Sequence, residues 1–322
     1  MELTISNDME SFREIPLSMV HVGHVYDFDI YLKLQDTKRL FAAKGLPLTR
    51  VHLIMMSRSE TRLYVREEEW VAARNEFEHD MRYVFTDPRL DSRQKADLIY
   101  TLAMQSIRDA YNGLIPRTIV DVQKDADEQV KHILSDEEVL GHLRLMNTSG
   151  GSTYQHSLRV GIYATALLLK LMGDRLTSAQ IRRISMGFFL HDIGMARVPM
   201  QILKKPGRLD DFEMRLIRMH PLWGQKRMIT TGSLNLEAVN IILAHHEHLD
   251  GSGYPHKRSQ DSIPLFARIC TIADAFEALT AERPYRKPLA PFSALRVMYQ
   301  DLSHGFDPEL FTAFVKLLGP EA

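Results

Sequence analysis

Histidine and aspartate side chains lie at the ends of, or inside, the most apolar helical stretches of this chain, and this feature restricts its possible folds most. His191 and Asp192 directly follow the apolar run ISMGFFL, and His245 and His246 follow VNIILA. Asp274 lies inside ARICTIADAFEAL, which is apolar almost all round, as a buried helix is. Buried charge is costly unless it is paired or bound to a metal. The sequence therefore predicts a fold in which these groups meet.

Two further histidines extend the pattern. His156 lies in the amphipathic stretch STYQHSLRVGIYATALLL, and His220 precedes Pro221 near the end of a helical stretch rich in Met, Leu and Ile. Taken alone, either is more simply a core or capping histidine. Five imidazoles and two carboxylates without a thiolate suit Fe, Mn, Co, Ni or Zn. Seven ligands are too many for one tetrahedral ion, so we expect two adjacent ions, which can generate hydroxide and hold a phosphodiester for in-line attack.

Composition excludes several other classes of protein. The chain of 322 residues has 40 basic and 41 acidic side chains and a net charge of −1, so long nucleic acid is not an expected partner. The single cysteine, Cys270, excludes an intramolecular disulfide and a Cys-based zinc site. The first residues lack a signal-peptide pattern, and no apolar run reaches the roughly 18 residues of a membrane span. We expect a cytoplasmic protein without a membrane span.

The N-terminal part, residues 1–80, is predicted to be a small α/β or β domain with a regulatory or dimerising role. Its short β-prone segments are separated by turn residues such as Gly45 and Pro47. The predicted strands are Val25–Leu32, Leu53–Met56 and Arg62–Val65.

The rest of the chain has helical spacing of apolar residues, so the fold class is predicted to be mainly α. Residues 81–135 form an expected helical connector, with one helix over Ser92–Tyr111 and another from Pro116 to about Leu134. The catalytic domain is predicted at 136–322.

Four ordered motifs in 145–315 resemble the HD-GYP family, a branch of the HD phosphohydrolase superfamily. They are LHDIGMARVPMQILKKPGRL, MHPLWG, HHEHLDGSGYP and IADAFEALTAERPYR. The resemblance implies an all-helical HD-type catalytic domain with two or three metals. It also implies a phosphodiesterase that hydrolyses cyclic di-GMP to linear pGpG or on to GMP through a metal-activated hydroxide.

The resemblance also assigns residues to roles. Tyr254 stacks on a base or donates a hydrogen bond, and Gly253 allows the tight turn of its loop. Arg283 and Arg286 grip the phosphate oxygens, since guanidinium groups suit phosphate geometry. Asp192 bridges the ions and helps to position the attacking hydroxide. The implied metal ligands are His156, His191, Asp192, His220, His245, His246 and Asp274.

Other polar residues of this region are assigned less directly. Glu247 is either a group that orients an imidazole or a surface residue. His248 and His256 are expected on the surface, and His304 is expected to have a structural role.

Two positions depart from the family pattern. Met195 replaces the usual Lys of HDIGK, which removes a charge-assisted contact of about 1.5–3 kcal/mol. Ser152 stands where members with three metals carry a Glu four residues before the first histidine, so we expect two divalent ions, Fe or Mn, and not three.

Two alternatives to the phosphodiesterase stay open. The first is a catalytically weak HD-GYP module that senses cyclic di-GMP or serves as a scaffold for another protein, which Met195 favours. The second is a general phosphohydrolase of mononucleotides, which the GSGYP and RPYR segments make less favourable. Beside cyclic di-GMP, a diguanylate cyclase domain of the GGDEF type and a second copy of the chain are candidate partners.

Overall fold

The chain divides into two units, Met1–Thr101 and Leu102–Ala322. The computed structural model describes 12–15, 20, 24–34, 37–49, 51–52, 62–73, 76, 100, 107, 110–111 and 153–318, except for 206, 231–234 and 283–286 in the last range. Within this part of the chain, no helix is both long and apolar enough to cross a membrane. The division into 1–80, 81–135 and 136–322 stays a prediction, because most of the connector, with its two expected helices, falls outside the described residues.

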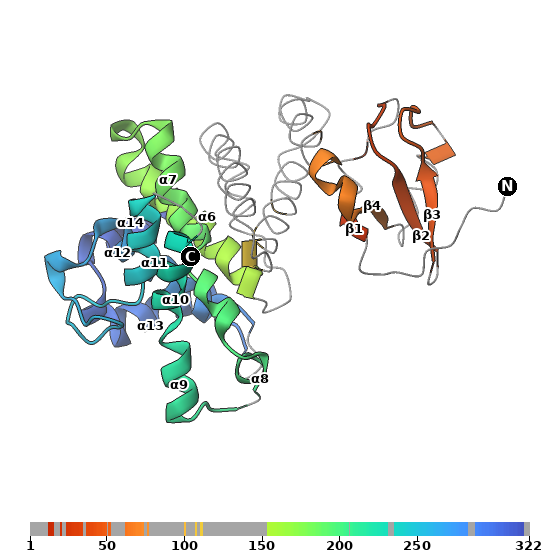
Figure 1. Ribbon diagram of the computed structural model, residues 1–322. Coiled ribbons are helices and arrows are strands. Elements are labelled where there is room, and N and C mark those ends of the chain that lie inside the picture. Colours follow the sequence, from red (N-terminus) through yellow and green to blue (C-terminus); the bar gives the residue numbers. More distant parts are fainter. Residues whose placement is uncertain are drawn as a thin grey trace. The chain divides into compact units, whose positions relative to one another are not determined.

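The first unit contains a four-stranded antiparallel sheet in the order β1-β4-β2-β3. The central strands β2 and β4 are buried on both faces: Leu32, Leu63 and Val65 are buried, and so are Tyr31 and Tyr64, which alternate with them and point to the opposite face. Figure 1 shows the sheet in the red and orange of the N-terminal residues. The strands are β1 (Phe12–Ile15), β2 (Ile30–Leu34), β3 (Thr37–Ala42) and β4 (Leu63–Arg66).

The expected small α/β or β domain is thus confirmed as a sheet, but its strands were only partly predicted. The strand expected at Val25–Leu32 is wrong in its first half, since pairing begins at Ile30 and Val25 makes only an isolated bridge to Pro47. The strand expected at Arg62–Val65 is β4, shifted by one residue. The strand expected at Leu53–Met56 lies outside the described residues.

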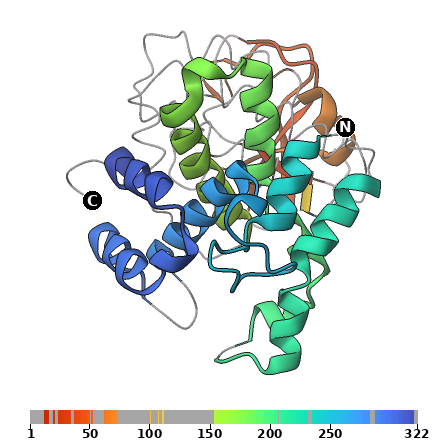
Figure 2. The same cartoon turned by 90° about the vertical axis from the view of Figure 1, so that its left-hand side faces the viewer.

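The described part of the second unit is helical, as the fold class predicts. The helices α6 and α12 pack against each other, while α7 and α14 pack on α6 (Figures 1 and 2). α11 contacts α7, α10 and α12, so it packs against three other helices of the bundle. The helices are α6 (Thr153–Met172), α7 (Ser178–Phe189), α8 (Met200–Leu203), α9 (Asp211–Ile217), α10 (His220–Thr230), α11 (Leu236–Ala244), α12 (Leu265–Thr280), α13 (Pro291–Asp301) and α14 (Pro308–Leu318).

Short 3-10 turns join these helices and fix their ends. The turn η5 (Ile193–Arg197) follows α7 and packs on α10, and a Cβ on its Gly194 would lie 1.9 Å from the His220 carbonyl oxygen. Only glycine allows this approach of η5 to the start of α10. The remaining turns are η3 (Glu67–Glu69) in the first unit and η4 (Gly173–Arg175), η6 (Gln260–Ser262) and η7 (Ser303–Gly305) in the second.

Candidate metal centre

The ends of several helices bring the predicted ligands toward one point. His156 lies in the first turn of α6, and His220 is the first residue of α10. The doublet His191–Asp192 follows Leu190, the residue that caps the end of α7. The remaining three residues are His245 and His246, which follow α11, and Asp274, which lies inside α12.

All seven predicted ligands fall into two groups of close donor atoms. Within each group, the ligand atoms lie within 4.8 Å of one another. Five of the seven side chains are buried and two are half-buried, so the groups are largely removed from solvent. One group is Asp192, His220, His245 and His246, and the other is His156, His191 and Asp274.

Asp192 belongs to the first group and also faces the second. Its Oδ1 is 3.0 Å from Nε2 of His220 and 3.7 Å from Nε2 of His245. Its Oδ2 is 3.6 Å from Nε2 of His156 and 3.8 Å from Nε2 of His191. One carboxylate thus faces both groups, a different oxygen toward each.

Backbone carbonyls orient three of the imidazoles in the same way. In each, Nδ1–H donates to the carbonyl oxygen three residues earlier, at 2.8–2.9 Å. This bond fixes the tautomer and leaves the Nε2 lone pair facing the centre, as metal-binding histidines require. The pairs are His191 with Phe188, His220 with Ile217, and His245 with Ile242.

A buried carboxylate orients His156 instead, and the sequence analysis missed it. Glu277 of α12 contacts Nδ1 of His156 and accepts a hydrogen bond from Nε of Arg159 at 2.7 Å. Glu277 is fully buried and Arg159 is 7% exposed. A signal was present, because Glu277 follows Asp274 by three residues and Arg159 follows His156 by three, so each pair shares one helix face.

Electrostatics within the centre shift several pKa values. Burial lowers the pKa of His156, but the carboxylates of Glu277 and Asp274 outweigh it and raise that pKa to about 10. Burial lowers the pKa of His191 to about 4 and that of His246 well below its usual value. Burial raises the pKa of Asp192, but His191 and His220 outweigh it and hold that pKa well below its usual range.

This donor set fits divalent metal. Imidazole nitrogens and carboxylate oxygens suit borderline transition metals, and a cation compensates the cost of burying carboxylates. Because the metal must replace the proton that His156 holds beside Asp274, metal binding would release protons.

The loop after α11 covers the centre from one side. Tyr254 stacks on His246, with ring centroids 4.7 Å apart, and the Arg218 guanidinium lies 5.6 Å from the Tyr254 ring centroid. Burial raises the pKa of Tyr254, so its phenol stays protonated. A Cβ on Gly253 would lie 2.4 Å from the His246 carbonyl oxygen, which explains the glycine there.

Glu247 differs from both alternatives left open for it. Its side chain is buried and accepts backbone hydrogen bonds from His256 at 2.7 Å and Arg258 at 2.8 Å. It therefore anchors the loop rather than orienting an imidazole or facing solvent. His256 is exposed as expected, whereas His248 is half-buried and packs against Gly305.

Comparison with known proteins decides the family. The profile described as HD domain matches residues 140–310, which is more than half of the chain. The chain belongs to the HD domain family.

Relatives named as cyclic dinucleotide phosphodiesterases agree with the resemblance to the HD-GYP family seen in the motifs. A cyclic di-GMP phosphodiesterase of Pseudomonas aeruginosa is 37% identical over 193 residues, covering 60% of this chain and 46% of that protein. A 3'3'-cGAMP-specific phosphodiesterase of Vibrio cholerae is 37% identical over 175 residues, covering 54% of this chain and 37% of that protein. The chain thus spans less than half the length of these relatives.

A solved structure agrees with the fold. An HDG"Y"P protein from Bdellovibrio bacteriovorus is similar with a TM-score of 0.69 at 18% identity, covering 95% of this chain and 99% of that chain. At this identity the likeness bears on the fold alone, and it extends beyond the HD domain.

Not every predicted site residue of the HD domain can be placed. Arg283, Arg286 and Ser152 lie outside the described residues. Met195 lies in η5, half-exposed, and its backbone N–H donates to the Asp192 carbonyl oxygen at 2.8 Å. Met195, which stands where the family usually has lysine, therefore lies one helical turn after Asp192, whose carboxylate faces both groups.

Proposed function

We propose that this chain is a metal-dependent phosphodiesterase that hydrolyses cyclic di-GMP to linear pGpG or on to GMP. One observation carries the proposal: seven buried or half-buried donor side chains form two groups that share Asp192. Two ions held side by side suit the in-line cleavage of a phosphodiester. The relatives named as cyclic di-GMP and 3'3'-cGAMP phosphodiesterases support this class of substrate.

In this proposal the metals are two Fe or Mn ions, one in each group. When bound, such ions lower the pKa of water and stabilise charge that develops on the phosphate. His220, His245 and His246 would hold one ion, and His156, His191 and Asp274 the other. Asp192 would contact both and position the attacking water between them.

Other residues would bind the substrate. Tyr254 lies over His246, and its protonated phenol can donate a hydrogen bond to the substrate or stack on a base. Gly253 allows the loop to approach His246 closely. Arg283 and Arg286 are proposed to bind phosphate oxygens as paired donors.

A turnover assay with Mn or Fe supplied tests the proposal. We expect linear pGpG or GMP to form from cyclic di-GMP and formation to stop when the metal is removed by chelation and dialysis. Tight binding without product would contradict the enzyme and support a second candidate, a sensor or scaffold. Met195 favours this second candidate, because the usual Lys would place a positive charge near the phosphate.

Replacing Met195 with lysine is expected to improve substrate use. The restored charge-assisted contact should raise kcat/KM for cyclic di-GMP about tenfold. Met214→Lys in α9 is the matched control, since Met214 is 38% exposed and lies outside both groups. Steady-state kinetics measures both variants, and equal kinetics for Met195→Lys and the original chain would contradict the importance of the missing charge.

The proposal also includes the cellular location and the partners of the protein. The single cysteine, Cys270, is buried and free, which suits the reducing cytoplasm. A GGDEF-type diguanylate cyclase domain and a second copy of the chain stay predicted partners, and size-exclusion chromatography with light scattering would test the latter.

A further inference from the structure

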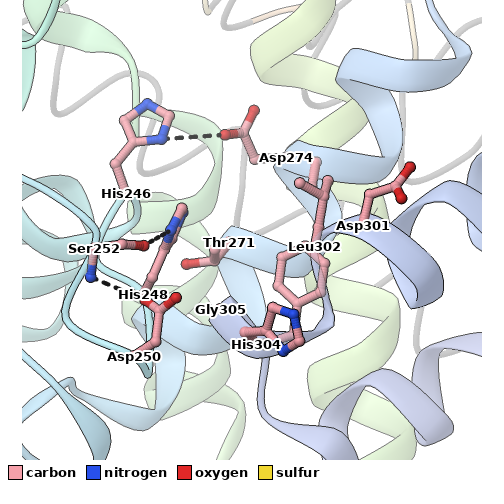
Figure 3. A pocket seen from close by; sticks show the side chains of 12 residues that line it. His246, His248, Asp250, Ser252, Thr271, Asp274, Asp301, Leu302, His304 and Gly305 are labelled. Atoms are coloured by element: carbon pink, nitrogen blue, oxygen red, sulfur yellow. Dashed lines mark hydrogen bonds and ion pairs between the residues drawn. The ribbon is translucent and has the colours of Figure 1, made fainter.

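A cavity of about 320 Å³ opens beside the metal groups. His246 and Asp274, two of the proposed ligands, line it on one side. The end of α13 and the turn η7 line another side through Asp301, Leu302 and His304 (Figure 3). The cavity therefore begins at the metal groups and extends away from them.

Contacts between the loop and η7 fix the shape of this cavity. The backbone N–H of Leu249 donates to the Gly305 carbonyl oxygen at 3.1 Å. His248 packs closely on Gly305, since a Cβ added to Gly305 would lie 3.1 Å from Cγ of His248. Nδ1 of His248 also lies 3.0 Å from Oγ of Ser252. These bonds join two distant parts of the chain, so the walls are in place before a ligand binds.

The charge of the walls excludes a second phosphate as the occupant. None of the 12 described residues that line the cavity is Lys or Arg, whereas Asp250, Asp274 and Asp301 supply three carboxylates. Away from the metal groups, the carboxylates of Asp250 and Asp301 would repel an anionic phosphate. A neutral group with hydrogen-bond donors and an apolar face would fit, because Leu302 and Phe306 add apolar surface.

One of the three carboxylates belongs to this cavity alone. Asp274 is part of a metal group. Asp250 accepts a hydrogen bond from the backbone N–H of Ser252 at 2.9 Å, within its own loop. Asp301 belongs neither to the metal groups nor to that loop.

We infer that this cavity binds one guanine base of the substrate, with Asp301 as the group that selects it. The inference rests on the proposed function. A carboxylate accepts from both N1–H and N2–H of guanine, whereas adenine presents an acceptor at N1 and would be disfavoured. Ligand pockets commonly have about 300–1,000 Å³, so this cavity holds a single nucleoside and not the whole cyclic dinucleotide.

Two variants of the full, metal-reconstituted chain test the inference. Asp301→Asn removes the charge that selects guanine, and Leu302→Trp fills the cavity without removing a polar group. Asp174→Asn, at an exposed position in η4, is the matched control. The substrates are cyclic di-GMP, cyclic di-AMP and bis(p-nitrophenyl) phosphate, a small phosphodiester that needs only the metal centre. Calorimetry with a hydrolysis-resistant phosphorothioate analogue of cyclic di-GMP gives binding without turnover.

Both variants should raise KM for cyclic di-GMP and Kd for its analogue about tenfold. In both variants, the ratio of kcat/KM for cyclic di-GMP to kcat/KM for bis(p-nitrophenyl) phosphate should also fall about tenfold. Asp301→Asn should also reduce the preference for cyclic di-GMP over cyclic di-AMP.

The other outcomes separate the two proposals. If the original chain neither hydrolyses the diesters nor binds the analogue, the proposed function fails. If it binds cyclic di-GMP but both variants bind it equally well, the cavity is not a base subsite. If the variants lose kcat/KM equally for cyclic di-GMP and for bis(p-nitrophenyl) phosphate, the effect lies in the metal centre and the inference is overturned. The inference is also overturned if the original chain hydrolyses cyclic di-AMP as efficiently as cyclic di-GMP.

Discussion

Asp192→Asn is expected to lower kcat for cyclic di-GMP by roughly a thousandfold or more. Asp192 faces both donor groups, with Oδ1 toward His220 and Oδ2 toward His156. An amide has the same shape but no charge, and its nitrogen cannot bind a cation. Losing several kcal/mol of charge stabilisation corresponds to about three powers of ten in rate.

The control for Asp192→Asn is Asp211→Asn, at an exposed position in the first turn of α9. Single-turnover kinetics and metal content should be measured for both variants, with thermal unfolding to show that each is folded. A folded Asp192→Asn variant that keeps more than a tenth of the original kcat would contradict a role between the two ions.

Glu277→Gln is expected to lower metal affinity by about 10–100-fold, because Glu277 orients His156 from outside the donor groups. The change also leaves the Arg159 guanidinium buried without its carboxylate. Removing one partner of a buried ion pair costs roughly 3–5 kcal/mol of unfolding free energy. Metal titration and chemical denaturation measure the two effects separately.

A double variant separates positioning of His156 from neutralisation of Arg159. Combining Arg159→Leu with Glu277→Leu removes both buried charges, so stability should largely return. Metal affinity should stay low, because His156 has still lost the acceptor at Nδ1. Full recovery of metal affinity in the double variant would show that Glu277 only neutralises Arg159.

Five of the seven donor residues stand out in the sequence because they conflict with their apolar surroundings, whereas His156 and His220, taken alone, do not. His191, Asp192, His245 and His246 end apolar runs, and such groups need partners when buried. Glu277 and Arg159 lie in equally apolar helices, but an acidic and a basic residue far apart in sequence do not reveal that they meet. Only the packing of α6 on α12 brings them together.

The strands of the sheet could be predicted only in part from the sequence. The strand β3 was not predicted because TKRLFA begins with polar and basic residues, and it is paired with β2 from Thr37 to Ala42. VYDFDIYL was expected to be a strand throughout, yet its first half pairs only at Val25. Pairing partners and not local composition decide where these strands begin.

The role of the loop after α11 also depended on long-range contacts. Glu247 follows two predicted ligands, so its position suggested a group that orients an imidazole or a surface residue. Its carboxylate instead accepts backbone hydrogen bonds from His256 and Arg258, nine and eleven residues later. Spacing along the chain does not predict such a bond, because the loop closes by irregular turns.

The metal content of the full chain tests the central claim most directly. The protein would be reconstituted with Fe or Mn under reducing conditions, freed of unbound metal, and measured by inductively coupled plasma mass spectrometry against protein concentration. Two donor groups that share Asp192 predict about two ions per chain. One ion or fewer per chain in the folded protein would contradict the account.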